Sequence, residues 1–281
     1  MTIAEALSTA TARLTENEVS EPRREAASLL SFVLQKNTAF LIAHPEYQLA
    51  PTENDAFENV VTRRSAREPY QYIVGRQEFY GLDFEVVPGV LIPRPETEIL
   101  VEAAIKILAD SENPNFLEIG VGTGCISVSI LHHAKHARAD AVDISDAALD
   151  LAARNAAKHE VAGRLTLSKG DLYHDITTNY DLIVSNPPYI PDTDLVGLQP
   201  EVGKFEPHTA LFGGHDGLSV VRRIIAAAPE FLKPAGCLLI EIGFGQSASV
   251  KELFDPEIWG NVDFIPDFQG IPRIAKARLL A

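Results

Sequence analysis

The chain has 281 residues, 46% of them hydrophobic, which is enough for a full α/β domain and a smaller second domain. Its formal net charge of −15 argues against a protein that grips nucleic acid through a broad basic face, because no run of Lys and Arg offsets that charge. The two cysteines stand among apolar and glycine neighbours, and no signal-peptide or bilayer-spanning pattern is present, so we expect a cytoplasmic protein without disulfides or membrane contact.

Residues 1–73 predict a small bundle of helices. Apolar residues from Ile3 to Leu14 follow helical spacing, and Pro22 suits the first turn of a second helix. No residue in this segment suggests catalysis. We therefore interpret it as a domain that grips a partner or covers an active site, in preference to a purely structural addition.

Residues 74–93 change to an alternating pattern and predict a β-hairpin that links two domains. Residues 94–281 then alternate strands and helices, which predicts an α/β domain whose mostly parallel sheet is covered on both faces. The last two strand candidates have no helix between them, so one of them should run antiparallel. The seven predicted strands are 115–119, 139–144, 165–168, 180–185, 237–242, 262–265 and 274–280.

A glycine-rich turn follows the first of these strands. Glycines at alternate positions let the backbone bend sharply and bring a ligand against the main chain. The spacing differs from the G-x-G-x-x-G of dinucleotide-binding folds, in which a pyrophosphate rests on the start of a helix. Glu118, two residues before the first glycine, favours a ligand with positive charge near the turn. The turn consists of Gly120, Val121, Gly122, Thr123 and Gly124.

Two further strands end in acidic residues. Asp143, followed by Ile144, can accept both hydroxyls of a ribose, although this alone does not separate one nucleoside cofactor from another. Asp171 can accept from an adenine amino group while Leu172 packs on the ring, and the alternative for this acid is an ordinary turn. In combination with the glycine turn, the order of these residues predicts an S-adenosylmethionine site.

The sequence Asn186-Pro187-Pro188-Tyr189 directly follows the predicted strand 180–185, at the end where α/β proteins place reactive groups. The two prolines remove N–H donors, so the chain leaves a carbonyl facing the cavity. That carbonyl and the Asn186 side-chain oxygen form two acceptors for one planar –NH2 group, and Tyr189 offers a flat face to it. The alternative is a proline-rich turn without chemistry, which the upstream motifs disfavour.

Two histidines, His132 and His136, lie four residues apart on a predicted helix. Their neighbours are polar, and no cysteine or third carboxylate stands close in the sequence. We therefore predict a solvated helix face and no metal site.

Four motifs together resemble those of the HemK-type protein-(glutamine-N5) methyltransferases. They are Pro93-Arg94-Pro95-Glu96-Thr97-Glu98, the glycine turn, Asn186 to Ile190, and Phe205-Glu206-Pro207 with Ala210-Leu211. The resemblance implies a class I S-adenosylmethionine-dependent methyltransferase, Rossmann-like, with a seven-stranded, mostly parallel sheet containing one antiparallel strand. It implies methyl transfer to the side-chain amide nitrogen of the glutamine in the Gly-Gly-Gln motif of peptide chain release factors.

By the same resemblance, Asn186 and the Pro187 carbonyl hold the acceptor amide, and Asn186 also contacts the cofactor. Leu172 departs from the pattern, because some members of the family carry an aromatic residue there. The predicted catalytic and substrate-binding residues are Asn186, Pro187, Pro188 and Tyr189, with Arg94 and Glu96 added for substrate binding.

Three alternatives stay open at this point. A sibling enzyme that methylates a glutamine of a ribosomal protein would use identical chemistry. An enzyme methylating DNA or RNA bases would flip the base onto Tyr189, but the net charge of −15 counts against it. A silent cofactor-binding scaffold is disfavoured because the Asn-Pro-Pro-Tyr motif is intact. We expect release factors as partners and no direct nucleic acid binding.

Overall fold

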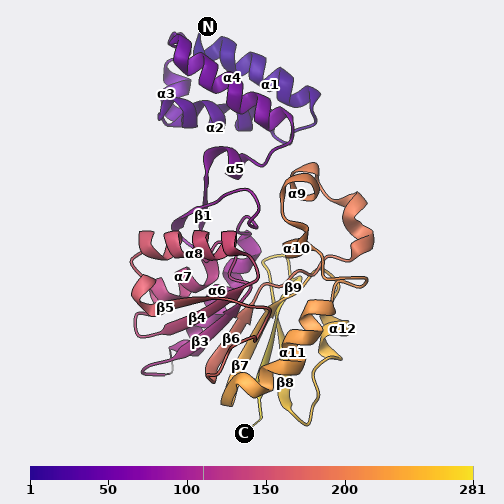
Figure 1. Cartoon of the computed structure of the whole chain (residues 1–281). Coiled ribbons are helices and arrows are strands. Elements are labelled where there is room, and N and C mark those ends of the chain that lie inside the picture. Colours follow the sequence, from indigo (N-terminus) through magenta and orange to yellow (C-terminus); the bar gives the residue numbers. More distant parts are fainter. Residues whose placement is uncertain (110, 281) are drawn as a thin grey trace. The chain divides into compact units, whose positions relative to one another are not determined.

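The structure, a computed structural model, describes residues 1–109 and 111–280 (Figure 1). The chain divides into two compact units. The helical unit contains Met1–Arg76 together with Gln199–Phe205, and the catalytic unit contains Gln77–Leu198 and Glu206–Ala281. The expected boundary was residue 73, and nothing in the sequence predicted that the short segment 199–205 would join the helical unit.

The helical unit is a small bundle, as predicted. Its helices bury one apolar stripe each, and the side chains of Ile3, Leu14, Leu29 and Leu30 are fully buried in their common core. Pro22 occupies the first turn of its helix, where its missing N–H costs nothing. The elements are α1 (Ile3–Glu16), α2 (Pro22–Leu34), α3 (Thr38–Ala43), α4 (Pro51–Ser65), α5 (Tyr70–Val74) and α9 (Pro200–Phe205).

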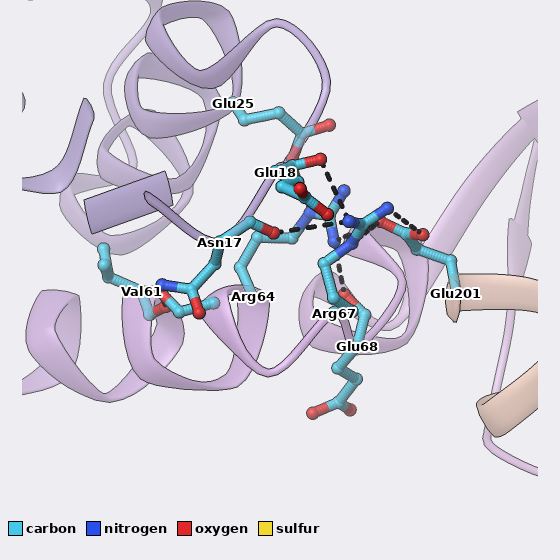
Figure 2. Close-up of polar contacts among 9 residues, drawn as sticks. Asn17, Glu18, Glu25, Val61, Arg64, Arg67, Glu68 and Glu201 are labelled. Carbon is cyan, nitrogen blue, oxygen red and sulfur yellow. Dashed lines mark hydrogen bonds and ion pairs between the residues drawn. The ribbon is translucent and has the colours of Figure 1, made fainter. Parts of the chain in front are cut away.

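A cluster of charged residues attaches α9 to the other helices of this unit (Figure 2). Arg67 donates two hydrogen bonds of 2.7 Å to the two carboxylate oxygens of Glu201. Arg64, whose side chain is 6% exposed, donates to Glu201 Oε1 at 2.9 Å and to Glu25 at 3.0 Å. Burial raises the pKa of Glu201, but the bonds from Arg67 and Arg64 outweigh it and hold the pKa below its usual value. Both oxygens of Glu201 therefore have a cationic partner.

The catalytic unit contains a hairpin and a seven-stranded sheet of order β5-β4-β3-β6-β7-β9-β8. Strands β3 to β7 pair in parallel, and β9 runs antiparallel to both β7 and β8, which confirms the predicted mostly parallel sheet with one antiparallel strand. The strands are β1 (Arg76–Phe79), β2 (Leu82–Glu85), β3 (Asn115–Ile119), β4 (Arg138–Asp143), β5 (Leu165–Lys169), β6 (Tyr180–Ser185), β7 (Leu232–Glu241), β8 (Trp259–Pro266) and β9 (Pro272–Leu279).

The hairpin is shorter than the predicted linker, because β2 ends at Glu85. Val90 and Ile92 are buried, but they lie outside any strand. Pro88 and Pro93 lack N–H donors, so this segment contributes apolar side chains without a hydrogen-bonded ladder.

Helices cover both faces of the sheet (Figure 1). Alternate residues of β6 point to opposite sides, since Leu182 and Val184 belong to one apolar cluster and Ile183 to the other. One cluster includes side chains of α6 and α7, and the other includes those of α11 and α12. The helices of this unit are α6 (Glu98–Leu108), α7 (Cys125–His133), α8 (Asp146–Lys158), α10 (His208–Leu211), α11 (Ser219–Phe231) and α12 (Ser247–Lys251), with 3-10 turns η1 (Pro95–Thr97), η2 (Ala162–Arg164) and η3 (Asp192–Gly197).

Because β3 to β7 are parallel, their carboxyl ends lie along the same edge of the sheet, where open α/β sheets bind ligands. Across the residues that the structure describes, no helix has the length and apolar character needed to cross a membrane.

Candidate active site

The candidate residues gather at the carboxyl ends of the parallel strands. The glycine turn follows β3, Asp143 ends β4, and Asn186 follows β6. The turn η1 reaches the same place, because Asn186 Nδ2 donates a 3.0 Å hydrogen bond to the Thr97 hydroxyl. Residues from four separate stretches of the chain thus form one site.

The glycine turn has a backbone that only glycine adopts without strain. Gly120, Gly122 and Gly124 have φ angles of 78°, 53° and 79°, all in the left-handed region. A Cβ atom at Gly124 would also lie 3.1 Å from the Cβ of Ala152. At Gly120 and Gly122 an added Cβ would meet nothing within 4 Å. The turn is therefore a fixed piece of main chain whose outer side is open to a ligand.

Asp143 is held in place by the main chain. Its Oδ2 accepts from the Gly122 N–H and its Oδ1 from the Ser145 N–H, both at 2.9 Å. Each carboxylate oxygen keeps a further lone pair, so the group can still accept two hydroxyls of a ribose. The adjacent Ile144 is 56% exposed and offers an apolar surface beside the acid. That Asp143 and Ile144 hold a cofactor remains a prediction, with which this placement is consistent.

The Asn186-Pro187-Pro188-Tyr189 segment presents two free acceptors. The bond to Thr97 occupies Nδ2 of Asn186, and no donor among the described residues reaches Oδ1 or the Pro187 carbonyl. The Tyr189 carbonyl accepts from Gln246 Nε2 at 2.9 Å, which fixes the end of the segment. Burial and then the charge of Glu241 raise the pKa of Tyr189, so its ring stays neutral.

The loop Gly213-Gly214-His215-Asp216-Gly217 packs directly on this segment. A Cβ at Gly213 would lie 2.5 Å from the Pro188 carbonyl oxygen, and one at Gly217 would lie 2.2 Å from that of Tyr189. Only glycine fits at these two positions. The loop therefore gives the motif close backbone support.

Comparisons with known proteins agree on one family. The model of the PrmC N-terminal domain matches residues 5–75, and that of the methyltransferase small domain matches residues 96–196. The release factor glutamine methyltransferase of Geobacter sulfurreducens is 43% identical over 267 residues, which cover 95% of this chain and 93% of the relative. That of Cereibacter sphaeroides is 41% identical over 281 residues and the full length of both chains. The chain belongs to the release factor glutamine methyltransferase family.

This membership confirms the resemblance inferred from the four motifs. The fold is also that of solved methyltransferases. The hMettl16 catalytic domain in complex with the MAT2A 3'UTR hairpin 6 superposes with a TM-score of 0.59 at 16% identity, covering 82% of each chain. At that identity the similarity shows the fold alone.

Glu118 is buried below the protein surface, which the sequence did not indicate. Its side chain is fully buried and accepts from the N–H and the hydroxyl of Ser127, so it anchors α7. Burial raises the pKa of Glu118 to about 8, against the opposing bonds from Ser127, and the group is therefore mostly protonated at neutral pH. Burial thus weakens the charge on which the argument for a cationic ligand relied, and the contact of Glu118 with the cofactor remains a prediction.

Asp171 and Leu172 lie at the loop after β5. Asp171 accepts from Arg223 at 2.7 Å, and both side chains are more than half exposed. Leu172 packs partly against the apolar cluster that contains the buried side of α11. Their assignment to the adenine remains a prediction.

Arg94 and Glu96 differ in their surroundings. Arg94 donates to Glu206 Oε1 at 2.5 Å, while Glu206 Oε2 accepts from the Ile92 N–H at 3.2 Å. The Glu206 side chain is 1% exposed, so this pair ties the Phe205-Glu206-Pro207 motif to the loop before η1. Glu96 is exposed. Their contact with substrate stays a prediction.

Glu241 is a site residue that the sequence analysis missed. It ends β7 and is 2% exposed, and its Oε2 has no partner among the described residues. Burial raises the pKa of Glu241 to about 7, and the nearby hydroxyls of Thr97 and Tyr189 oppose that rise. Its position at the end of a predicted parallel strand, the rule that selected Asp143, could have identified it.

Proposed function

We propose that this protein transfers a methyl group from S-adenosylmethionine to the side-chain amide nitrogen of the glutamine in the Gly-Gly-Gln motif of peptide chain release factors. The observation that carries the proposal is the pair of free acceptors, Asn186 Oδ1 and the Pro187 carbonyl, at the end of β6. The names of the relatives support the choice of release factors as the substrate. Such a substrate would be met in the cytoplasm, where translation takes place.

The residues present suit this cofactor. The main chain of the glycine turn is open on its outer side, and Asp143 keeps lone pairs for two hydroxyls beside the exposed Ile144. We therefore assign the cofactor to the glycine turn, Asp143 and Ile144, with Asp171 and Leu172 at the adenine. When bound, S-adenosylmethionine supplies a methyl group activated by a sulfonium.

The chain's own residues must overcome the weak nucleophilicity of an amide. The nitrogen lone pair is delocalised into the carbonyl, so the protein has to promote the reaction by positioning the nitrogen. Asn186 Oδ1 and the Pro187 carbonyl each accept one N–H and fix the nitrogen in one orientation. Positioning of this kind lowers a barrier by about 7–11 kcal/mol. As positive charge develops on the nitrogen, both hydrogen bonds strengthen, which favours the transition state over the ground state.

No base is required before the transfer. The nitrogen becomes acidic only once it has gained the methyl group, and its proton can then leave. Tyr189 lines the site with a neutral ring, so it does not compete for the proton.

The test offers the purified protein a radiolabelled methyl donor with three acceptors in parallel: a release factor, ribosomal proteins and nucleic acid. We expect label on the release factor, mapped by mass spectrometry to the glutamine of Gly-Gly-Gln. Label on a ribosomal protein alone would show that the protein performs the same reaction on a different substrate and would refute the choice of release factors. Label confined to nucleic acid would overturn the proposal.

A further inference from the structure

The orientation of the Asn186 amide decides whether the proposed reaction can occur. A carboxamide fits the same space in two orientations that exchange its oxygen and its –NH2 group. With Oδ1 outward, Asn186 can accept from the acceptor amide. With Nδ2 outward, two –NH2 groups would face each other and no hydrogen bond could form. Some part of the structure must therefore select the first orientation.

The contact that selects it is the 3.0 Å bond from Asn186 Nδ2 to the Thr97 hydroxyl. A hydroxyl has one hydrogen to donate and two lone pairs to accept with. If the Thr97 hydrogen pointed at Asn186, the hydroxyl would attract Oδ1 and reverse the amide. The Thr97 hydroxyl accepts from Nδ2 only while its own hydrogen is directed elsewhere.

Glu241 gives that hydrogen its direction. Its carboxyl group is buried at the end of β7, where burial raises its pKa and the nearby hydroxyls of Thr97 and Tyr189 oppose that rise. Thr97 is itself 2% exposed, so water does not compete freely for the hydroxyl. In its ionised form the Glu241 carboxylate can only accept, and it then fixes the Thr97 hydroxyl as the donor.

We propose that Thr97 and Glu241 are positioning residues that set the amide orientation of Asn186, so that Oδ1 and not Nδ2 faces the acceptor amide. The Thr97 hydroxyl bonds Asn186 Nδ2, and the buried Glu241 carboxyl, whose Oε2 has no partner among the described residues, is the acceptor assigned to the Thr97 hydrogen. The effect of this orientation on catalysis rests on the proposed function, whereas the orientation itself can be measured without a substrate.

The first test compares two substitutions of Thr97. Thr97→Val has nearly the shape of threonine but lacks the hydroxyl, while Thr97→Ser keeps the hydroxyl. We expect Thr97→Val to lower kcat on the release factor by about 10–100-fold, the range known for groups that orient metal ligands. The Kd for S-adenosylmethionine should change little, and Thr97→Ser should stay close to the wild type. Thr62→Val is the matched control, because its hydroxyl bonds the Glu58 carbonyl in the helical unit.

The second test uses Glu241. Glu241→Gln keeps a side-chain oxygen for the Thr97 hydroxyl, whereas Glu241→Leu removes it. We expect the leucine variant to lose kcat while its fold is at least as stable as the wild type, because a desolvated carboxyl group has been removed. The glutamine variant should recover most of the activity. A residue with a purely structural role would lose stability and activity together.

A third measurement separates this inference from the proposed function. The side-chain –NH2 signals of Asn186, assigned in a ¹⁵N-labelled sample through their absence from Asn186→Asp, report its hydrogen bond directly. We expect them to shift, and their hydrogen exchange to quicken, in Thr97→Val and Glu241→Leu but not in Thr97→Ser. Unchanged signals, or equal activity of the valine and serine variants, would overturn the inference. If the signals respond but the protein leaves release factors unmethylated, the proposed function is refuted. The role of Thr97 and Glu241 in orienting Asn186 is then retained.

Discussion

The two units each contain a partly buried polar cluster, and the clusters differ in how fully their hydrogen bonds are satisfied. In the helical unit, both oxygens of Glu201 accept from Arg64 or Arg67, and Arg64 is held in addition by Glu25. In the catalytic unit, Asn186 Oδ1 and Glu241 Oε2 have no partner among the described residues.

This difference separates a structural role from a chemical one. A closed network rigidifies the parts that it joins and has nothing left to offer a ligand. An unpaired buried acceptor costs about 1–3 kcal/mol, so it persists only where the surrounding packing holds it. The support of the Asn186 to Tyr189 segment by the Gly213 to Gly217 loop supplies such packing. We therefore expect substitutions in the open cluster to change rates, and substitutions in the closed cluster to change stability.

The largest effect should come from Asn186→Ala, which removes one of the two free acceptors. We expect kcat on the release factor to fall by about 100-fold or more, as for the loss of one polar contact to developing charge. Thermal unfolding should shift little, and calorimetry should show nearly unchanged binding of S-adenosylmethionine. Equal losses of rate and of cofactor affinity would mean that Asn186 serves the cofactor alone.

The next effect concerns Asp143, which we assign to the ribose of the cofactor. Asp143→Asn keeps the shape but replaces one carboxylate oxygen by an –NH2 group, which cannot accept a ribose hydroxyl. We expect the Kd for S-adenosylmethionine to rise by about 10–100-fold, since hydrogen bonds to charged groups contribute about 1.5–3 kcal/mol. At saturating cofactor, kcat should recover. An unchanged Kd would place the ribose elsewhere.

The closed cluster should respond in stability. A double-mutant cycle of Arg67→Ala and Glu201→Ala, measured by urea unfolding, should give a coupling energy of about 1–3 kcal/mol for this partly buried, bidentate pair. The matched control is the exposed pair of Lys106 and Glu102, four residues apart on α6, for which we expect about 0.3–0.5 kcal/mol. Equal coupling in the two pairs would remove the distinction between the clusters.

The last effect is a change in the pH dependence of stability, caused by Glu118. Its pKa is about 8 in the native state and 4.5 for the solvated side chain, so between these pH values the native protein holds a proton that the unfolded chain has lost. The unfolded state therefore binds fewer protons there, and stability falls as pH rises from about 4.5 to about 8. Each pKa unit corresponds to about 1.4 kcal/mol, so the total is a few kcal/mol at most.

Glu118→Gln should flatten this dependence, because a glutamine carries no proton to lose. The measurement is the free energy of unfolding of both proteins at several pH values across that range. The advantage of the variant over the wild type should grow with pH. A constant difference would show that Glu118 is ionised in the native protein.

The sequence predicted those features that local patterns encode. Alternation of strands and helices predicted the parallel sheet, and the rule that strands end at one edge placed Asp143 and Asn186 together. The Thr97 to Asn186 bond joins residues 89 apart in the chain, and that of Arg67 to Glu201 joins residues 134 apart. No local pattern encodes such pairings. The burial of Glu118 was not predicted for a related reason, because the fold, and not the residue type, determines the desolvation that raises its pKa.

A structure of the protein with S-adenosylhomocysteine, the cofactor after methyl loss, and a release factor tests the central claim most directly. The account predicts that the side-chain nitrogen of the Gly-Gly-Gln glutamine lies within hydrogen-bonding distance of both Asn186 Oδ1 and the Pro187 carbonyl oxygen. A glutamine bound with its nitrogen away from these two oxygens would contradict it.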